Sequence, residues 1–398
     1  MTYFKLPINY HFNITQANIK LQFKEKDDYN IICSYNLQKY LTETKKKIDN
    51  ISYLWDSVKI YTNPYEFIHT TVPHFSYSVS KYKPISRAFY KLLEIYNLFN
   101  ITNISEPINT FHLAEGPGGF VEATMFIRNN KKDNYVGMTL LDRNSNTPGW
   151  KKSKKFLDKF PNISLEAGKD NTGNLYNEEN YIFCCKRYTK KFEIITGDGG
   201  IDFSGDYNNQ EQTASRLIIT QLFYALSMQK IGGTFILKMF DLFTKVSIDV
   251  VYLLTIFYKK VFIVKPYTSR YANSEKYIVA MDFKQNISEE LQNKFFGILK
   301  ILNNIDFNKY QISSILNLKQ NLYFMNHLEE INIILGQRQI ENILYTIKII
   351  NNRDKYNDKI EKFKSTNIIR SIKWCNNNNL ETNNFDSLIN PINIFLKK

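Results

Sequence analysis

The feature that most constrains the fold is an alternation of short apolar runs with longer segments of helical period, between residues 110 and 283. Short apolar runs predict buried strands, and the longer periodic segments between them predict crossover helices. Strands joined by such helices pair in parallel, so the block predicts an α/β fold with a mostly parallel sheet covered by helices. We place seven strands, at residues 110–114, 135–141, 163–167, 192–196, 234–237, 261–264 and 277–281.

Periodic apolar faces predict helices within this block and on both sides of it. Residues 211–230 and 246–259 are long enough to be crossover helices, and residues 84–99 repeat apolar side chains at helical spacing. The sequence after residue 283 is rich in such periods. They fall at residues 289–302, 318–335 and 340–350.

The length of 398 residues allows one large α/β domain with appended segments, because single cores stop growing at about 250–300 residues. We expect an accessory N-terminal segment at residues 1–62, the α/β domain at 63–284 and a helix-rich C-terminal extension at 285–398. The N-terminal segment matches no module that we can assign.

The formal net charge of +14 would attract the chain to a polyanion, such as nucleic acid or an anionic membrane surface. Codon bias in an AT-rich genome would also enrich Lys, Asn, Ile, Tyr and Phe. The charge therefore favours a nucleic-acid partner only modestly.

The four cysteines lack the C-x-x-C pairs of a zinc site, which suggests a reducing compartment and no bound metal. No apolar run reaches the ~20 residues of a membrane span, and the N-terminus lacks the apolar region of a signal peptide. We expect an intracellular soluble protein without membrane contact, cytoplasmic rather than nuclear.

A glycine-rich turn follows the first strand of the block and opens a helix. It consists of Glu115, Gly116, Pro117, Gly118, Gly119 and Phe120. Glycine lets the backbone turn sharply and approach a ligand, and the helix N-terminus offers unpaired N–H groups. The turn lies at the carboxyl edge of the predicted sheet, where ligands bind. An ordinary tight turn is the alternative; the acidic residue and the proline favour a nucleoside with an amino-acid tail over a dinucleotide.

Charged residues end two apolar strands of the block. Asp198 follows one and Lys238 follows the next, with one crossover helix between them, so neighbouring parallel strands would bring their side chains together. A polar loop from Lys265 to Glu275 leads into the last strand. If that strand is antiparallel, Glu275 faces Asp198 and Lys238. A structural salt bridge and a solvated loop are the alternatives.

These motifs occur in a characteristic order. The sequence contains S-R-A-x-x-K-L around Lys91, E-G-P-G-G-F at 115–120, D-G-G from Asp198, G-G-x-x-x-x-K-x-F-D around Lys238 and S-R-x-x-N-S-E ending at Glu275. Between about residues 63 and 283 the chain resembles FtsJ/RrmJ-type ribose 2′-O-methyltransferases, with most similarity to cap-specific mRNA methyltransferases. The resemblance implies a Rossmann-like S-adenosylmethionine-dependent methyltransferase fold, with a seven-stranded sheet containing one antiparallel strand.

The resemblance also implies site residues. The K-D-K-E tetrad of the family falls on Lys91, Asp198, Lys238 and Glu275. Contacts to the methyl donor S-adenosyl-L-methionine fall on residues 115–120 and on a loop at 168–174 that would bind the adenosine. In that loop Asn174 stands where the cap enzymes usually have Asp. The further donor-binding candidates are Asp142, Asp170, Asn174 and Asp198.

A groove for RNA is implied next to the tetrad. The expected substrate-binding residues are Asn63, Tyr65, Arg87, Asn208, Asn209, Gln210, Arg270 and Asn273. Tyr65 and Tyr267 are candidates for stacking on a guanine or a splayed nucleotide. The expected partner is 5′-capped mRNA, with other capping or transcription proteins as further candidates.

The implied reaction is methylation of a cap-proximal ribose, which gives a cap 1 structure. Lys238 would steer the 2′-oxygen and take its proton, Lys91 would stabilise the oxyanion, and Asp198 and Glu275 would orient the lysines. The carboxylates favour a charged Lys238, whereas the second lysine and the donor's sulfonium oppose it. Two alternatives remain open: methylation of ribosomal or transfer RNA, and a non-catalytic RNA-binding subunit on the same fold.

Overall fold

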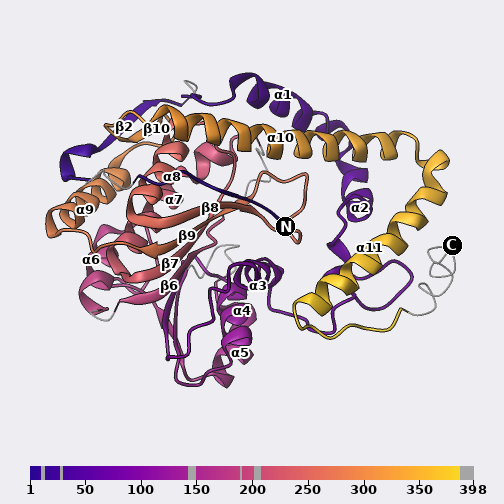
Figure 1. Ribbon diagram of the computed structural model, residues 1–398, viewed down its shortest axis with the longest axis horizontal. Helices are drawn as coiled ribbons and strands as arrows, with labels where there is room; N and C mark the ends of the chain where they lie inside the picture. Colours follow the sequence, from indigo (N-terminus) through magenta and orange to yellow (C-terminus); the bar gives the residue numbers. More distant parts are fainter. Residues whose placement is uncertain (10–13, 27–29, 142–148, 189–190, 201–207, 386–398) are drawn as a thin grey trace.

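The computed structural model describes residues 1–9, 14–26, 30–141, 149–188, 191–200 and 208–385. Within these residues an eight-stranded sheet has the order β1-β8-β9-β7-β6-β3-β4-β5. Figure 1 labels the neighbouring strands β8, β9, β7 and β6 of this sheet. Its strands are β1 (Thr2–Lys5), β3 (Asn109–Leu113), β4 (Asn134–Met138), β5 (Ile163–Glu166), β6 (Phe192–Gly197), β7 (Gln229–Met239), β8 (Tyr258–Lys265) and β9 (Lys276–Phe283). The neighbours β7, β6, β3, β4 and β5 pair in parallel in this order. β9 lies between β7 and β8 and runs antiparallel to both.

The α/β fold and all seven predicted strands are confirmed, but the sheet has one strand more than expected. β1 pairs antiparallel with β8, with Thr2 opposite Lys265. A four-residue strand is too short to show a clear period of two, so β1 was not predicted. The boundaries expected at residues 62 and 284 stay predictions.

Helices cover both faces of the sheet and bury a separate core on each. On one face lie α3 (Ala88–Phe99) and α4 (Gly119–Arg128), and on the other lie α6 (Glu178–Arg187), α7 (Gln210–Met228) and α8 (Lys245–Phe257). Successive strand residues alternate between the two cores because side chains along a strand point to opposite faces. Examples are Ile194 and Ile195, Ile236 and Leu237, and Ile278 and Val279.

The N-terminal and C-terminal segments pack on each other across this domain (Figure 1). The elements of these segments are β2 (Ile19–Glu25), α1 (Tyr35–Lys46), α2 (Ser52–Thr62), α9 (Glu289–Asn304), β10 (Tyr310–Leu316), α10 (Leu322–Asn351) and α11 (Asn357–Asn377). The short helix α5 (Lys154–Lys159) belongs to the α/β domain and lies between β4 and β5 in the chain. β10 pairs with β2 in a two-stranded sheet that was not predicted. None of the helices in the described ranges is long and apolar enough to cross a membrane.

The two helices expected at 318–335 and 340–350 are one continuous helix, α10. Residues 336–339 interrupt the apolar period of the sequence but not the helix. In the structure Gly336 lets α10 approach α1 closely, because a Cβ atom there would come within 2.9 Å of the Leu37 side chain. α10 thereby lies across the carboxyl edge of the sheet, next to the loop between β8 and β9.

Candidate active site

The four tetrad residues meet at the carboxyl edge of the sheet. Asp198 directly follows β6 and Lys238 lies near the end of the parallel neighbour β7, where Lys238 is paired with Tyr277 of β9. Because β9 is antiparallel, Glu275 precedes it at this same edge. Lys91 reaches the group from α3, on one face of the sheet.

The tetrad forms two ion pairs. The Lys91 Nζ atom lies 2.8 Å from each carboxylate oxygen of Glu275. The Lys238 Nζ atom lies 3.2 Å from Asp198 Oδ1 and donates a hydrogen bond of 2.7 Å to the Asp198 carbonyl oxygen. Each of the four side chains is only 11–14% exposed, so both pairs are largely removed from water.

The two pairs also act on each other electrostatically. Burial lowers the pKa of Lys91, the charges of Glu275 and Asp198 oppose this shift, and the charge of Lys238 adds to it. Burial alone would raise the pKa of Glu275, but Lys91, Lys238 and Lys265 hold it far below its ordinary value. Glu275 is therefore ionised, and the four groups act as one charged cluster.

Tyr277 completes the cluster and was not identified from the sequence. Its fully buried hydroxyl donates a hydrogen bond of 2.9 Å to Asp198 Oδ1. Burial, together with Asp198 and Glu275, raises the pKa of Tyr277 well above its ordinary value. With 27 tyrosines in the chain, only the antiparallel register opposite Lys238 could have singled it out.

The glycine-rich turn lies beside the cluster, and its tight geometry depends on glycine. Gly118 has a φ of +112°, which L side chains rarely adopt, and a Cβ atom on Gly119 would collide with Ser86 at the start of α3. Glu115 is turned inward, where one carboxylate oxygen accepts hydrogen bonds from the backbone N–H groups of Phe120 and Val121. Burial and the charge of Asp198 raise its pKa to about 8, against the effect of these hydrogen bonds and of Lys238.

The loop at 168–174 lies against the end of β4. The backbone N–H of Leu141 donates to the Thr172 carbonyl oxygen at 2.7 Å, and a Cβ atom on Gly173 would overlap the Thr139 carbonyl. The carboxylate of Asp170 accepts hydrogen bonds within the loop region from Thr172, Asn177 and Asn180, and Asn174 Oδ1 accepts one from the Tyr176 N–H. Asp142, the alternative acidic residue, lies outside the described residues.

Two exposed leucines border this loop and were not predicted. Leu140 and Leu141, directly after β4, are each 41% exposed. The Leu141 side chain lies in contact distance of Gly173. Large exposed aliphatic side chains at a ligand-binding edge are candidates for covering a flat apolar group.

Several basic and amide residues expected to contact RNA form hydrogen bonds or ion pairs with other protein groups. Arg270 donates two hydrogen bonds to the buried Glu66, at 3.0 and 2.5 Å, and an Arg87 nitrogen lies 3.8 Å from the same carboxylate. Asn63 accepts a hydrogen bond from the Tyr271 N–H and donates one to the Lys59 carbonyl. The function of Glu66 as a shared anchor could not be read from the sequence.

The other expected substrate residues lie around the same loop. Tyr65 stacks on Tyr267 with ring centroids 4.8 Å apart, so the two predicted stacking residues contact each other. Gln210 Oε1 accepts a hydrogen bond from Ser274, which brings the start of α7 next to Asn273. Asn208 and Asn209 line a cavity of about 360 Å³ between α1 and the start of α7.

Residues 84–283, half of the chain, match the FtsJ-like methyltransferase family. The chain is similar to proteins named cap-specific mRNA (nucleoside-2′-O-)-methyltransferase 1. One from Xenopus laevis is 28% identical over 305 residues, 70% of this chain and 34% of the relative. The one from Homo sapiens is 34% identical over 200 residues, 48% of this chain and 23% of the relative.

A relative of the same name from Dictyostelium discoideum is 28% identical over 349 residues, which are 78% of this chain and 42% of that protein. The chain thus spans less than half the length of each of these three relatives. Since the match to the family covers the helix of Lys91, the glycine-rich turn and the strands that carry the other tetrad residues, this chain belongs to the FtsJ-like methyltransferase family.

Proposed function

We propose that this chain transfers a methyl group from S-adenosyl-L-methionine to a ribose 2′-hydroxyl of RNA, at the cap-proximal nucleotide of mRNA. The observation that carries the proposal is the meeting of Lys91, Asp198, Lys238 and Glu275 in two adjacent ion pairs. They lie close enough to the glycine-rich turn for Asp198 and Lys238 to shift the pKa of Glu115.

The residues at the carboxyl edge fit the donor. The backbone of Gly116–Gly119, with no side chain at Gly118, would hold the amino-acid tail, and the exposed Leu140 and Leu141 beside the 168–174 loop would cover the adenine. Asp170, Asn174 and, on sequence grounds, Asp142 remain candidates for the ribose and adenine edges. The bound donor supplies a methyl group made electrophilic by a sulfonium.

The tetrad would act on the 2′-oxygen. In this proposal Lys238 directs a lone pair of the oxygen and accepts its proton at Nζ, while Asp198 and Tyr277 fix the position of that nitrogen. Lys91, held by both oxygens of Glu275, stabilises the negative charge that develops on the oxygen. Lys238 accepts the proton as a neutral amine, since an ammonium has no free lone pair, and the two carboxylates balance the charge of Lys91 and of the ammonium that forms on Lys238.

The names of the relatives support capped mRNA as the substrate. Further support comes from the N-P-Y-E stretch at 63–66 and the T-S-R-x-x-N-S-E stretch at 268–275, which resemble stretches of the cap-specific members of the family. In the described structure these two stretches contact each other through Glu66 and Arg270, which supports a shared role at one groove. Ribosomal or transfer RNA is the alternative substrate.

Radiolabelled methyl transfer tests the proposal. The same RNA is offered with and without an m7G cap, to the wild type and to Lys238→Ala. We expect label on the capped RNA with the wild type and none with the variant, although the variant folds and binds the donor. Lys230→Ala is the matched control, because Lys230 lies on the same strand, is 56% exposed and pairs only with Glu193 among the ion pairs of the described residues.

The alternatives give different results. Equal label on the uncapped RNA would show that the enzyme does not need a cap, and would favour ribosomal or transfer RNA as the substrate. Donor binding without label on any RNA would favour a non-catalytic RNA-binding subunit.

A further inference from the structure

The loop between β8 and β9, residues 266–275, has to place Glu275 without any helix or strand of its own. Loops are generally more mobile than the elements that they connect, whereas catalytic groups need to be held within about 0.5 Å. The groups that hold this loop are therefore part of the proposed active site, even where they do not touch a reactant.

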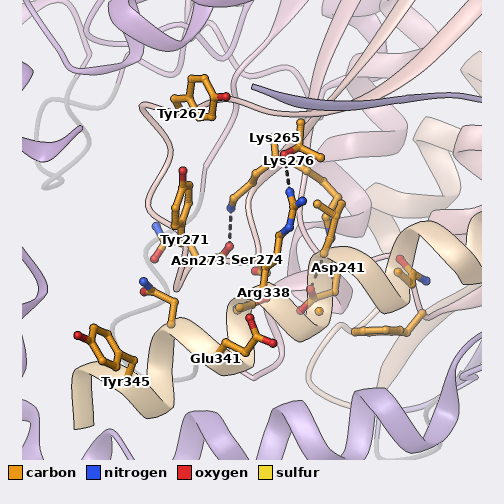
Figure 2. A pocket seen from close by; sticks show the side chains of 17 residues that line it. Asp241, Lys265, Tyr267, Tyr271, Asn273, Ser274, Lys276, Arg338, Glu341 and Tyr345 are labelled. Atoms are coloured by element: carbon orange, nitrogen blue, oxygen red, sulfur yellow. Dashed lines mark hydrogen bonds and ion pairs between the residues drawn. The ribbon is translucent and has the colours of Figure 1, made fainter. Parts of the chain in front are cut away.

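Lys265, the last residue of β8, closes the loop at its base. Its Nζ atom donates hydrogen bonds to the carbonyl oxygens of Asn273, at 2.5 Å, and Glu275, at 2.6 Å. Figure 2 shows the side chain reaching from the strand toward Asn273. One ammonium group thereby joins the outgoing end of the loop to the returning end that carries Glu275.

The surroundings of Lys265 separate it from the reacting groups. It lines a cavity of about 550 Å³ between the loop and α10, together with Lys276, Asp241 and Tyr271 (Figure 2). None of the four tetrad residues lines this cavity as the described residues form it. Lys265 therefore contacts Glu275 at the Glu275 backbone carbonyl, from the side of the cavity. The cavity also leaves room for a longer side chain at position 265.

Other groups hold the rest of the loop. Glu94, one helical turn after Lys91 on α3, accepts hydrogen bonds from the N–H groups of Tyr267 and Thr268 and from the Thr268 hydroxyl. Glu66 holds Arg270. Two side-chain hydrogen bonds remain at the returning end without Lys265, from the Ser269 hydroxyl to Glu275 Oε1 and from the Ser274 hydroxyl to Gln210 Oε1. Loss of Lys265 should therefore loosen the backbone of Glu275 and leave the start and the middle of the loop attached.

We infer that Lys265 is a positioning residue, whose ammonium fixes the backbone of Glu275 and, through the Glu275 carboxylate, the position of Lys91. Burial lowers the pKa of Lys265 to about 7, against the charge of Glu275, so below that pH the charge of Lys265 also helps to keep Glu275 ionised. The inference rests on the proposed methyl transfer, because the tetrad is what Lys265 would position.

The test compares Lys265→Met, which keeps the length and removes the donors, with Lys265→Arg, which keeps a cation. Lys260→Met is the matched control, since Lys260 lies on the same strand, is 51% exposed and pairs with Asp282 instead. We expect Lys265→Met to lower kcat on capped RNA by about 10- to 100-fold. The KM for RNA and the affinity for S-adenosylhomocysteine should stay within about twofold of the wild type. The substitution should not change the contacts that bind the substrate equally in the ground state and the transition state. Lys265→Arg should restore most of kcat.

A second readout does not need activity. Amide hydrogen exchange at residues 273–277 should accelerate in Lys265→Met and stay unchanged in Lys260→Met. Wild-type kcat in Lys265→Met, or unchanged exchange, would overturn the inference. A kcat of Lys265→Arg as low as that of Lys265→Met would reduce Lys265 to an ordinary structural residue. If the wild type methylates no RNA, the proposed function fails, and exchange alone decides whether Lys265 orders Glu275.

Discussion

The two ion pairs of the tetrad have nearly equal exposure but are positioned in different ways. Asp198 and Lys238 lie on neighbouring parallel strands, so the sheet itself sets their separation. Lys91 and Glu275 come from a helix and from the end of a ten-residue loop, and their separation depends on buried side chains that anchor the loop. The strand-held pair needs little support, whereas the loop-held pair is only as well placed as its anchors.

The largest effect is expected in the strand-held pair. Lys238→Met should lower the single-turnover rate of methyl transfer by about 10²–10⁴-fold, because a group that moves the reacting proton contributes this much. The free energy of unfolding should also fall, by about 2–3 kcal/mol, because Asp198 loses its counter-charge in a pair as buried as that of Lys91 and Glu275. A rate within tenfold of the wild type would remove Lys238 from the chemistry.

The next largest effect is expected in the loop-held pair. Glu275→Gln leaves the buried Lys91 without its counter-charge, so the rate should fall by about 100-fold and the free energy of unfolding by about 2–3 kcal/mol. Urea unfolding measures the second quantity.

The stability difference between wild type and Glu275→Gln should depend on pH. Because the folded protein holds the pKa of Glu275 below its ordinary value of 4.5, this stabilisation is complete above pH 4.5 and is lost as the pH falls below it. The two unfolding curves should therefore converge in acid. A difference that is constant with pH would contradict the ionised Glu275.

A smaller effect is expected when the start of the loop is released. Glu94→Gln turns an amide toward the N–H groups of Tyr267 and Thr268, so kcat should fall by about tenfold and the free energy of unfolding by about 1–3 kcal/mol. Glu43→Gln, an exposed substitution on α1, is the control for stability and rate. If both variants behave like the wild type, the loop-held pair does not depend on this anchor.

The smallest effect is expected from Tyr277→Phe, which removes one hydrogen bond from the strand-held pair. Because the sheet still positions Asp198 and Lys238, the rate should fall by only about threefold to fivefold, the equivalent of about 1 kcal/mol. A fall as large as that of Glu275→Gln would show that the strand-held pair needs its own anchor, and the comparison would fail.

What the sequence could predict follows the same division. The strands and the residues that end them have strong local patterns, and therefore the sheet and the positions of Asp198 and Lys238 were foreseen. β1 is too short for a pattern, and the continuous α10 packs against α1 at Gly336, a tertiary contact that the local sequence does not indicate. Both were missed for that reason.

The loop-held side of the site was only partly predictable. Motif order identified Lys91 and Glu275, but the partners of Glu66, Glu94 and Lys265 are far away in the sequence or are backbone groups. The resemblance placed Arg270 at the groove for RNA, and that role stays a prediction. The structure adds that Arg270 donates to Glu66, a pairing that no local pattern indicates.

The most direct test of the central claim locates the transferred methyl group. After reaction with m7G-capped RNA, nuclease digestion and mass spectrometry should find one methyl group on the 2′-oxygen of a cap-proximal ribose with the wild type. The same digest should be unmodified with Lys238→Met. A methyl group on a base, or an equally methylated ribose with Lys238→Met, would contradict the account.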